Sequence, residues 1–157
     1  MFFSSQKKRE MVLSYYKAGN GQIDFEELKK KSFFWNLPIT FCQNKKGGCG
    51  DVFYLLTKKK NNRLDEILFS GHQSCLISVS TGSLLNFCLK GKEIKEVNDV
   101  IVNFQLMIWG KKGYFFDSSC SDIKMFEDIF KFPHRVGCVD MVLIGIRKGL
   151  GNFEFKE

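Results

Sequence analysis

Residues 52–69, VFYLLTKKKNNRLDEILF, contain two apolar runs separated by a short basic and polar stretch. Residues 52–57 and 64–69 are rich in aromatic and aliphatic side chains typical of strands, and the polar residues between them form a turn. Upstream, residues 33–41 place an apolar side chain at every odd position, which is the period of a half-buried strand, and Pro38 puts that strand at a sheet edge. Together these segments predict a three-stranded antiparallel sheet.

Segments with helical spacing lie on both sides of this sheet in the sequence. Ser4 to Lys17 forms an amphipathic pattern that ends at Gly19-Asn20-Gly21. The strongest helical pattern covers residues 94–108, where apolar residues follow steps of three and four. Further helices are expected at residues 84–89, 125–130 and 139–150. This order predicts a single α+β domain over residues 1–157, with the helices packed on one side of the three-stranded antiparallel sheet.

The composition predicts a globular protein of a reducing compartment. The chain has 157 residues, of which 44% are hydrophobic, and that is enough to build a core without disulfides. No segment approaches the roughly 20 apolar residues of a membrane span, and the N-terminus has no apolar signal-peptide core, so we expect a cytoplasmic protein. In that setting the six cysteines indicate metal binding or thiol chemistry rather than disulfides. None of them forms a CxxC pair.

The net charge of +7 is distributed over several short lysine and arginine patches. Distributed charge is typical of a solvated surface, and here it favours an acidic protein partner. No nucleic-acid recognition motif accompanies the charge, so nucleic acid is not the favoured partner. A membrane partner is not expected either.

Three cysteines lie at the boundaries of the predicted elements. Cys49 falls in GGCGD, residues 47–51, where an extended backbone would point Cys49 and Asp51 to the same side. Cys75 lies where the third strand gives way to a helix, and Cys138 opens the last helix. A helix N-terminus favours a thiolate over a thiol. The remaining cysteines are expected to be inert packing or surface residues: Cys42, Cys88 and Cys120.

Three short motifs in this order resemble the SufU branch of the U-type iron–sulfur cluster assembly proteins, the IscU/NifU N-terminal superfamily. They are Cys49-Gly50-Asp51, GHQSCLISVS at residues 71–80 and FPHRVGC at residues 132–138. The spacings between the cysteines also resemble that branch. The chain departs from the family at Gly47-Gly48, where an Asn-Pro pair is usual. The IscU-type scaffolds carry a histidine before the third cysteine, whereas this chain has Gly137.

The resemblance implies a zinc site and a sulfur relay. Its metal ligands would be Cys49, Asp51, Cys75 and Cys138, three thiolates and a carboxylate suited to tetrahedral Zn²⁺. Arg135 would offset part of their negative charge. Cys49 would accept the outer sulfur of a persulfide on a cysteine desulfurase of the SufS kind, acting as a sulfurtransferase in the broad sense. The sulfur would then pass to the downstream iron–sulfur assembly machinery.

Three alternatives stay open at the level of the sequence. The same cysteines could form a purely structural zinc site, which is the more common use of such ligands when no family likeness is considered. They could also carry a [2Fe–2S] cluster on an assembly scaffold, although Gly137 counts against this. A zinc-stabilised basic module for nucleic acid is the third. His72 and His134 lie near ligand cysteines, and we expect them at the surface or behind the ligands rather than on the metal.

Overall fold

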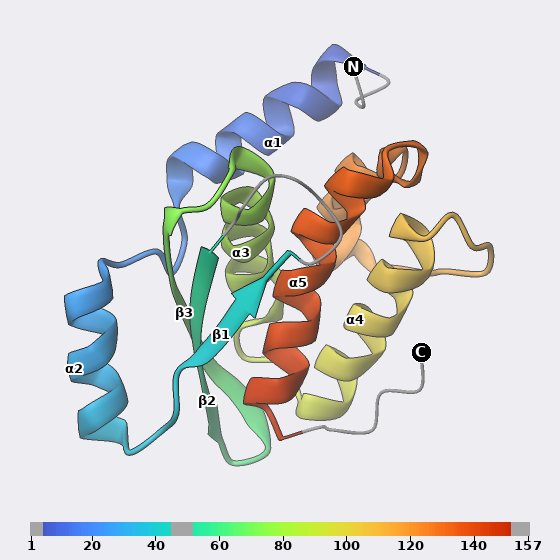
Figure 1. The fold of residues 1–157 in the computed structure, drawn as a ribbon. Coiled ribbons are helices and arrows are strands. Elements are labelled where there is room, and N and C mark those ends of the chain that lie inside the picture. The colour runs from blue at the N-terminus through green and yellow to red at the C-terminus, as the bar shows by residue number, and fades with distance from the viewer. Residues whose placement is uncertain (1–4, 45–51, 152–157) are drawn as a thin grey trace.

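The computed structural model describes residues 5–44 and 52–151, apart from the side chains of His72 and Gln73. Two helices precede the sheet, and the remaining helices follow it (Figure 1). The elements are α1 (Gln6–Ala18), α2 (Phe25–Trp35), β1 (Thr40–Gln43), β2 (Val52–Lys60), β3 (Arg63–Gln73), α3 (Leu76–Leu89), α4 (Ile94–Ile108), the 3₁₀ helices η1 (Ser118–Phe126) and η2 (Ile129–Lys131), and α5 (Pro133–Gly149).

The sheet is antiparallel with the order β1-β2-β3, as the sequence predicts. Lys60 pairs with Arg63 at the end of the β2–β3 hairpin. The two residues between them, Asn61 and Asn62, have φ values of 53° and 60°. Positive φ at both central residues is the geometry that matches the twist of a tight hairpin, and asparagine tolerates it. The polar stretch inside residues 52–69 therefore closes the hairpin.

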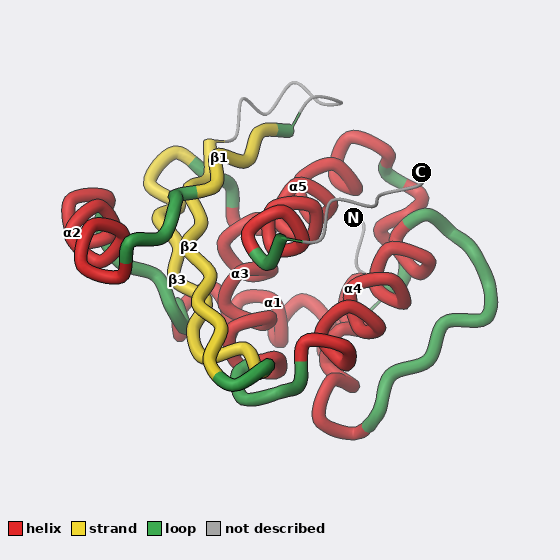
Figure 2. Tube along the Cα trace, turned by 90° about the horizontal axis from the view of Figure 1, so that it is seen from below, coloured by secondary structure: helices red, strands yellow, loops and turns green. Residues whose placement is uncertain are grey.

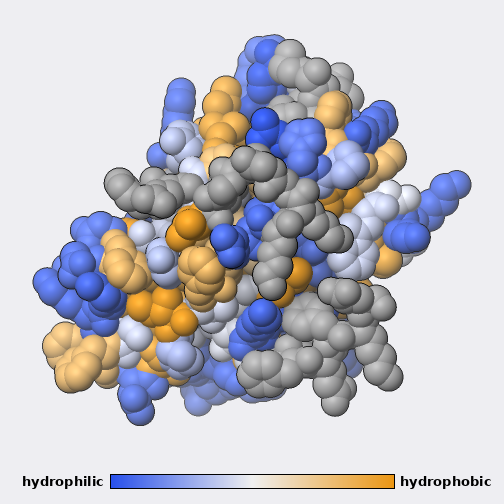
Figure 3. Space-filling model, viewed as in Figure 1, coloured by the Kyte–Doolittle hydropathy of each residue, from blue (hydrophilic) through white to orange (hydrophobic). Residues whose placement is uncertain are grey.

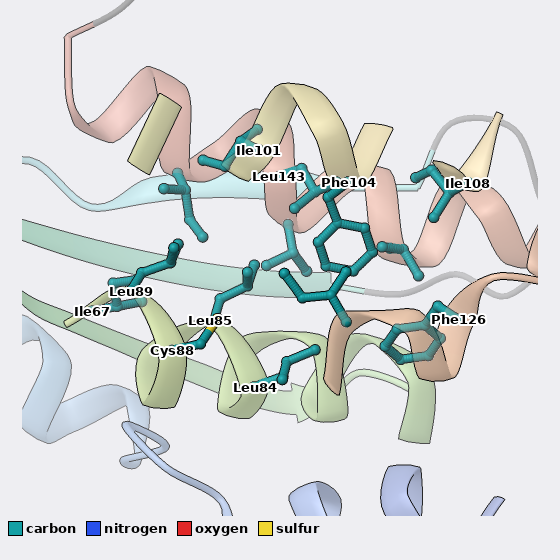
Figure 4. Packing of buried hydrophobic residues seen from close by; sticks show 14 of the residues in the cluster. Ile67, Leu84, Leu85, Cys88, Leu89, Ile101, Phe104, Ile108, Phe126 and Leu143 are labelled. Carbon is teal, nitrogen blue, oxygen red and sulfur yellow. The ribbon is translucent and has the colours of Figure 1, made fainter. Parts of the chain in front are cut away.

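The main core lies between one face of the sheet and α3, α4 and α5. Phe53 of β2 stacks on Phe69 of β3, with ring centroids 4.9 Å apart. Figure 4 shows Leu85 of α3, Phe104 of α4 and Leu143 of α5 packed together in this core. Helix α3 is the most deeply buried, since residues 77–86 have little exposed surface. Cys75, which caps this helix, is therefore held by a deeply buried element of the protein.

The strand predicted over residues 33–41 is wrong for most of its length. Residues 25–35 form α2, which starts where the Asp24 carboxylate accepts a hydrogen bond from the Glu27 backbone N–H at 2.9 Å. The helix ends at Asn36 in the left-handed conformation. An aspartate followed three residues later by a glutamate is a helix-start signal, and it outweighs the alternation. Only Thr40–Gln43 forms a strand, and it does lie at the sheet edge.

Helix α2 covers the face of the sheet opposite to the other helices (Figure 2). Its Leu28 is buried against Leu56 and Leu68 of the sheet. The predicted α+β class with a three-stranded antiparallel sheet is confirmed, and α2 adds a helix on the second face. Apolar side chains gather on the surface over α2 and β1 (Figure 3). Phe33 and Phe34 at the end of α2 are 83% and 81% exposed.

The last helix starts earlier than predicted. Proline has no backbone N–H to leave unpaired, so it suits the first turn of a helix, and α5 begins at Pro133. Cys138 therefore lies in the second turn of α5 and does not open the helix. The predicted helices at residues 4–17 and 94–108 are confirmed as α1 and α4, whereas residues 125–130 span the end of η1, a turn and the start of η2. Among the helices of the described residues, none is both long and apolar enough to cross a membrane.

Candidate metal centre

The four predicted ligands fall into two pairs. Cys49 and Asp51 lie outside the described residues. Cys75 and Cys138 are described, and so is the predicted charge partner Arg135. The geometry of the candidate site is therefore built from these two cysteines and from the residues that flank the first pair.

The start of β2 is fastened beside Cys75. Val52, which follows Asp51 in the sequence, pairs with Gln43 at the end of β1 and with Gln73 at the end of β3. The Ser74 hydroxyl also donates a hydrogen bond to the Val52 carbonyl. The backbone next to the predicted ligand Asp51 is thus held to the residue that precedes Cys75.

Cys75 is the N-cap residue of α3, as the sequence predicts. Its backbone is extended, with φ −77° and ψ 168°, and its carbonyl accepts the first helical hydrogen bond from the Val79 N–H at 3.1 Å. Its side chain is half-buried and lies with Sγ 3.7 Å from the Ser78 hydroxyl oxygen. At this position the first N–H groups of the helix and its dipole attract negative charge.

Ser78 connects the two described cysteines. Its hydroxyl donates a hydrogen bond to the backbone carbonyl of Cys138 at 3.1 Å. One buried serine therefore joins the first turn of α3 to the second turn of α5. Packing of these two helices places the Cys75 side chain and the backbone of Cys138 against the same hydroxyl group, although the two residues are far apart in the sequence.

Cys138 is fully buried, and two polar groups surround its sulfur. The Asn44 side-chain amide donates a hydrogen bond to Sγ at 3.3 Å, and the His134 backbone carbonyl lies 3.8 Å from Sγ. Asn44 follows β1 and is only 7% exposed. Sequence reasoning missed both Asn44 and Ser78. A signal for Ser78 is present, because it lies one helical turn after Cys75, but Asn44 has no motif around it.

The remaining predicted residues take secondary positions. Arg135 is half-buried in the first turn of α5, three residues before Cys138, so it lies on the same side of that helix. The His134 side chain is exposed, and its contact with Cys138 is made by its carbonyl. The side chain of His72 lies outside the described part of the structure.

The donor chemistry of this place fits zinc. Thiolate sulfur is a preferred zinc ligand, and zinc–thiolate sites are normally surrounded by N–H donors such as that of Asn44. Within residues 5–44 and 52–151, no three His, Cys, Asp or Glu side chains come together as a metal site. The two described sulfurs supply half of the predicted ligand set, and Cys49 and Asp51 would have to supply the rest.

The other three cysteines are buried, in agreement with a packing role, and no disulfide joins any of the cysteines that the structure describes. Burial raises the pKa of the Cys42 thiol to about 12. A hydrogen bond with Cys120, together with burial, raises the pKa of the Cys88 thiol. These thiols have surroundings that differ from those of Cys75, which is half-buried at a helix N-terminus.

A surface cavity of about 710 Å³ borders this region. Its lining includes Val52 at the start of β2 and Gly71 near the end of β3, together with Lys17 of α1 and Asp24 before α2. The backbone that flanks the predicted ligands is thus reachable from the surface.

Searches among known proteins identify relatives by sequence, although no family model matches the chain. The zinc-dependent sulfurtransferase SufU of Bacillus subtilis is 29% identical over 108 residues, covering 68% of this chain and 71% of that protein. The iron–sulfur cluster assembly scaffold protein IscU of Streptococcus pyogenes is 24% identical over 102 residues, which cover 65% of this chain. That match spans 63% of the Streptococcus protein, slightly less than two thirds of its length.

Solved structures share the fold. A hypothetical protein solved at 2.3 Å has a TM-score of 0.75 at 19% identity, over 92% of this chain and 97% of its own. FiSufU of Fervidobacterium islandicum, described as an iron–sulfur cluster assembly scaffold for the SUF system, has a TM-score of 0.70 at 23% identity. The match covers 90% of this chain and 94% of that chain. The N-terminal part of a NifU-like protein of Brucella abortus has a TM-score of 0.63 at 13% identity. The match covers 76% of this chain and 81% of that chain. In its motifs and its sequence relatives the chain resembles the SufU and IscU proteins, and it shares the fold of the solved SufU and NifU-like structures.

Proposed function

We propose that this protein takes part in iron–sulfur cluster assembly as a zinc-dependent sulfur acceptor. The observation that carries the proposal is the meeting of Cys75 and Cys138 at Ser78, beside the start of β2 that follows Asp51. A sequence relative, SufU of Bacillus subtilis, is named a zinc-dependent sulfurtransferase. Zinc would be held by Cys49, Asp51, Cys75 and Cys138.

The protein side chains supply the chemistry of the transfer. Bound zinc would keep its sulfur ligands deprotonated, and a thiolate is the form that attacks a sulfur–sulfur bond. The Cys49 thiolate attacks the outer sulfur of a persulfide on a cysteine desulfurase. A new sulfur–sulfur bond forms at Cys49 while the bond to the desulfurase cysteine breaks, and that cysteine leaves as a thiolate. The exchange needs no external oxidant or reductant, and the sulfur then goes to the downstream assembly machinery.

The surroundings of the site compensate its negative charge. Three thiolates and one carboxylate carry more negative charge than a divalent cation neutralises. The N-terminus of α3 at Cys75, the Asn44 N–H at Cys138 and the Arg135 guanidinium offer positive or partly positive groups. These groups favour a site that stays anionic when zinc is bound.

A second candidate is a scaffold that assembles a [2Fe–2S] cluster on the same cysteines. The Streptococcus relative, named a scaffold protein, favours it. Position 137 argues for zinc instead, because the resemblance expects a scaffold to carry a histidine there. A Cβ atom on Gly137 would lie 2.8 Å from Cγ of Asn44, so no side chain fits at 137 while Asn44 keeps its place.

Sulfur transfer from a cysteine desulfurase tests the proposal. The zinc-loaded protein is incubated with the desulfurase and cysteine, and its mass is measured before and after digestion. We expect a gain of about 32 Da on the peptide that contains Cys49. Cys49→Ser should lose this gain, whereas the control Cys42→Ser should keep it because Cys42 is buried away from the site. A gain of sulfur by Cys49→Ser equal to that of the wild type would contradict the assignment.

A further inference from the structure

Helix α5 approaches the sheet through glycines that make room for side chains of β1, β2 and the residue after β1. Gly137 faces Asn44, and Gly145 faces Cys42. A Cβ atom on Gly145 would overlap Sγ of Cys42 and lie 3.3 Å from Leu55. The space at Gly145 is filled by Cys42 and Leu55, whereas the space at Gly137 is filled by the buried amide of Asn44.

The Asn44 amide is held in one orientation. Its Nδ2 atom donates to the Cys138 sulfur at 3.3 Å and to the His134 carbonyl at 3.3 Å. A Cβ atom on Gly137 would lie 2.8 Å from Cγ of Asn44, 3.0 Å from Nδ2 and closer still to Oδ1. The amide therefore lies flat against the backbone of Gly137. Its N–H groups point in a fixed direction, because the two acceptors lie on one side of the amide and the backbone of Gly137 lies on the other.

We propose that Asn44 is a positioning residue that holds the sulfur of Cys138 in place, and that position 137 must be glycine for the Asn44 amide to reach it. The role in zinc binding rests on the proposed function, in which Cys138 is a ligand. The hydrogen bond itself does not depend on that function.

Two physical consequences follow for the sulfur. An N–H donor stabilises negative charge on sulfur and directs the remaining lone pairs away from the donor, as groups behind metal ligands commonly do. Asn44 also fastens the chain after β1 to the first two turns of α5, so the sulfur cannot shift away from the amide without losing this hydrogen bond. A side chain at position 137 and the Asn44 amide cannot occupy the same space, so the amide can contact the Cys138 sulfur only when residue 137 is glycine.

Two substitutions remove the amide from the sulfur by different routes. Asn44→Ala deletes the donor, and Gly137→Ala pushes it away while leaving Asn44 in the chain. Alanine is the better helix former, so Gly137→Ala would stabilise α5 if Asn44 could move freely. Gly145→Ala is the matched control, since it introduces the same methyl group on the same helix but against Cys42.

The experiment uses the full chain and two readouts. In chelator-treated protein, the rate of alkylation of Cys138 is followed by peptide mass spectrometry. In zinc-loaded protein, the rate of zinc release to a coloured chelator is followed by absorbance. We expect Asn44→Ala and Gly137→Ala each to raise the rate of zinc release about tenfold, as the loss of one hydrogen bond to a charged group would do. Each should lower the rate of Cys138 alkylation, because the reactive thiolate loses the N–H donor that stabilises it. Gly145→Ala should leave both rates near those of the wild type, even if it lowers the melting temperature.

The double variant Asn44→Ala/Gly137→Ala separates a shared cause from two independent defects. If both single changes act by removing the amide, the double variant should release zinc no faster, and should be alkylated no more slowly, than either single one, so the effects are not additive. Additive effects, or an Asn44→Ala variant with wild-type rates, would overturn the proposal. A wild-type protein that binds no zinc would contradict the proposed function, and the alkylation rates would still decide the role of Asn44.

Discussion

Cys42, which packs against α5, and Cys138, which lies in α5, are both buried thiols, yet their surroundings prepare them for different roles. Cys138 has a side-chain N–H donor at its sulfur. Both sulfurs lie near a backbone carbonyl, that of His134 at Cys138 and that of Thr40 at Cys42, but Cys42 packs against Gly145 and no side-chain N–H donor is described at its sulfur. A donor supports a thiolate, whereas an acceptor supports the protonated thiol. The groups around each sulfur therefore distinguish Cys138, a candidate ligand, from Cys42, a packing residue.

The Cys42 thiol should be unreactive in the folded protein. With a pKa of about 12, only about one Cys42 in ten thousand is ionised at about pH 8. We expect iodoacetamide to leave Cys42 unmodified until the protein is unfolded, as measured by peptide mass spectrometry. Rapid alkylation of Cys42 under native conditions would show that its surroundings are more open than described.

Serine at the three cysteines of the site should have unequal effects. Cys75 is fixed at the start of α3 and Cys138 inside α5, so Cys75→Ser and Cys138→Ser each remove a sulfur that no other group can replace. Both variants should lose most of their zinc and melt at lower temperature. Cys49→Ser should keep a substantial share of its zinc. A cysteine that leaves the metal while it accepts sulfur requires the other ligands to hold the metal without it. Metal analysis per chain and thermal melting measure this, and equal zinc loss in all three variants would contradict it.

At the scale of the elements, α1 is tied to the segment between α4 and α5. The Tyr15 hydroxyl donates a hydrogen bond to the Asp122 carboxylate at 2.6 Å, and the Lys8 ammonium group contacts Asp128 at 3.1 Å and also Glu127. Burial and the bond to Asp122 raise the pKa of Tyr15. Helix α1 packs mainly on α3, the helix that Cys75 caps. These bonds thus support the helix that carries one of the proposed ligands.

The tie at Tyr15 should give a dependence on alkaline pH. A raised pKa means that the folded protein keeps the Tyr15 proton while the unfolded chain releases it near about pH 10. This contribution to the free energy of unfolding is complete below that pH and is lost as the pH rises above it. Tyr15→Phe should cost about 1 kcal/mol at neutral pH, and it should weaken the further fall in stability above that pH.

Urea unfolding followed at several pH values measures this effect. Tyr16→Phe is the matched control, since Tyr16 is the next residue in α1 and is 43% exposed. A Tyr15→Phe variant that loses stability with alkaline pH as steeply as the wild type would contradict the role given to Tyr15.

The sequence predicted those elements whose signal is local. Helix α4 has a continuous apolar pattern, and the β2–β3 hairpin has its asparagine turn, so both were found. Helix α2 was missed because the odd positions of residues 33–41 imitate a strand, although Asp24 and Glu27 marked a helix start. The cysteine at the start of α3 was placed correctly. The support of Cys138 by Asn44 could not be predicted, since it depends on how β1 and α5 meet in space.

At the scale of the whole molecule, the proposed ligands come from parts of the chain that are far apart. Cys75 and Cys138 lie on α3 and α5, and Cys49 and Asp51 precede β2. A metal held by all four would link the sheet to both helices across one end of the core. Metal binding would then contribute directly to the stability of the fold.

Removal of zinc should therefore destabilise the entire protein. We expect chelation to lower the melting temperature by on the order of 10 °C, since a few kcal/mol corresponds to shifts of this size in a chain of this length. Added zinc should restore the original temperature. A melting curve that is unchanged after zinc removal has been verified would show that the metal does not hold these elements together.

The metal content of the protein, purified without added metal, tests the central claim most directly. Elemental analysis and the visible absorption spectrum are measured on the same sample, with sulfide determined chemically. A zinc-dependent sulfur acceptor should contain one zinc per chain and should be colourless. Stoichiometric iron and sulfide with visible charge-transfer bands would contradict this account and identify the chain as a cluster scaffold.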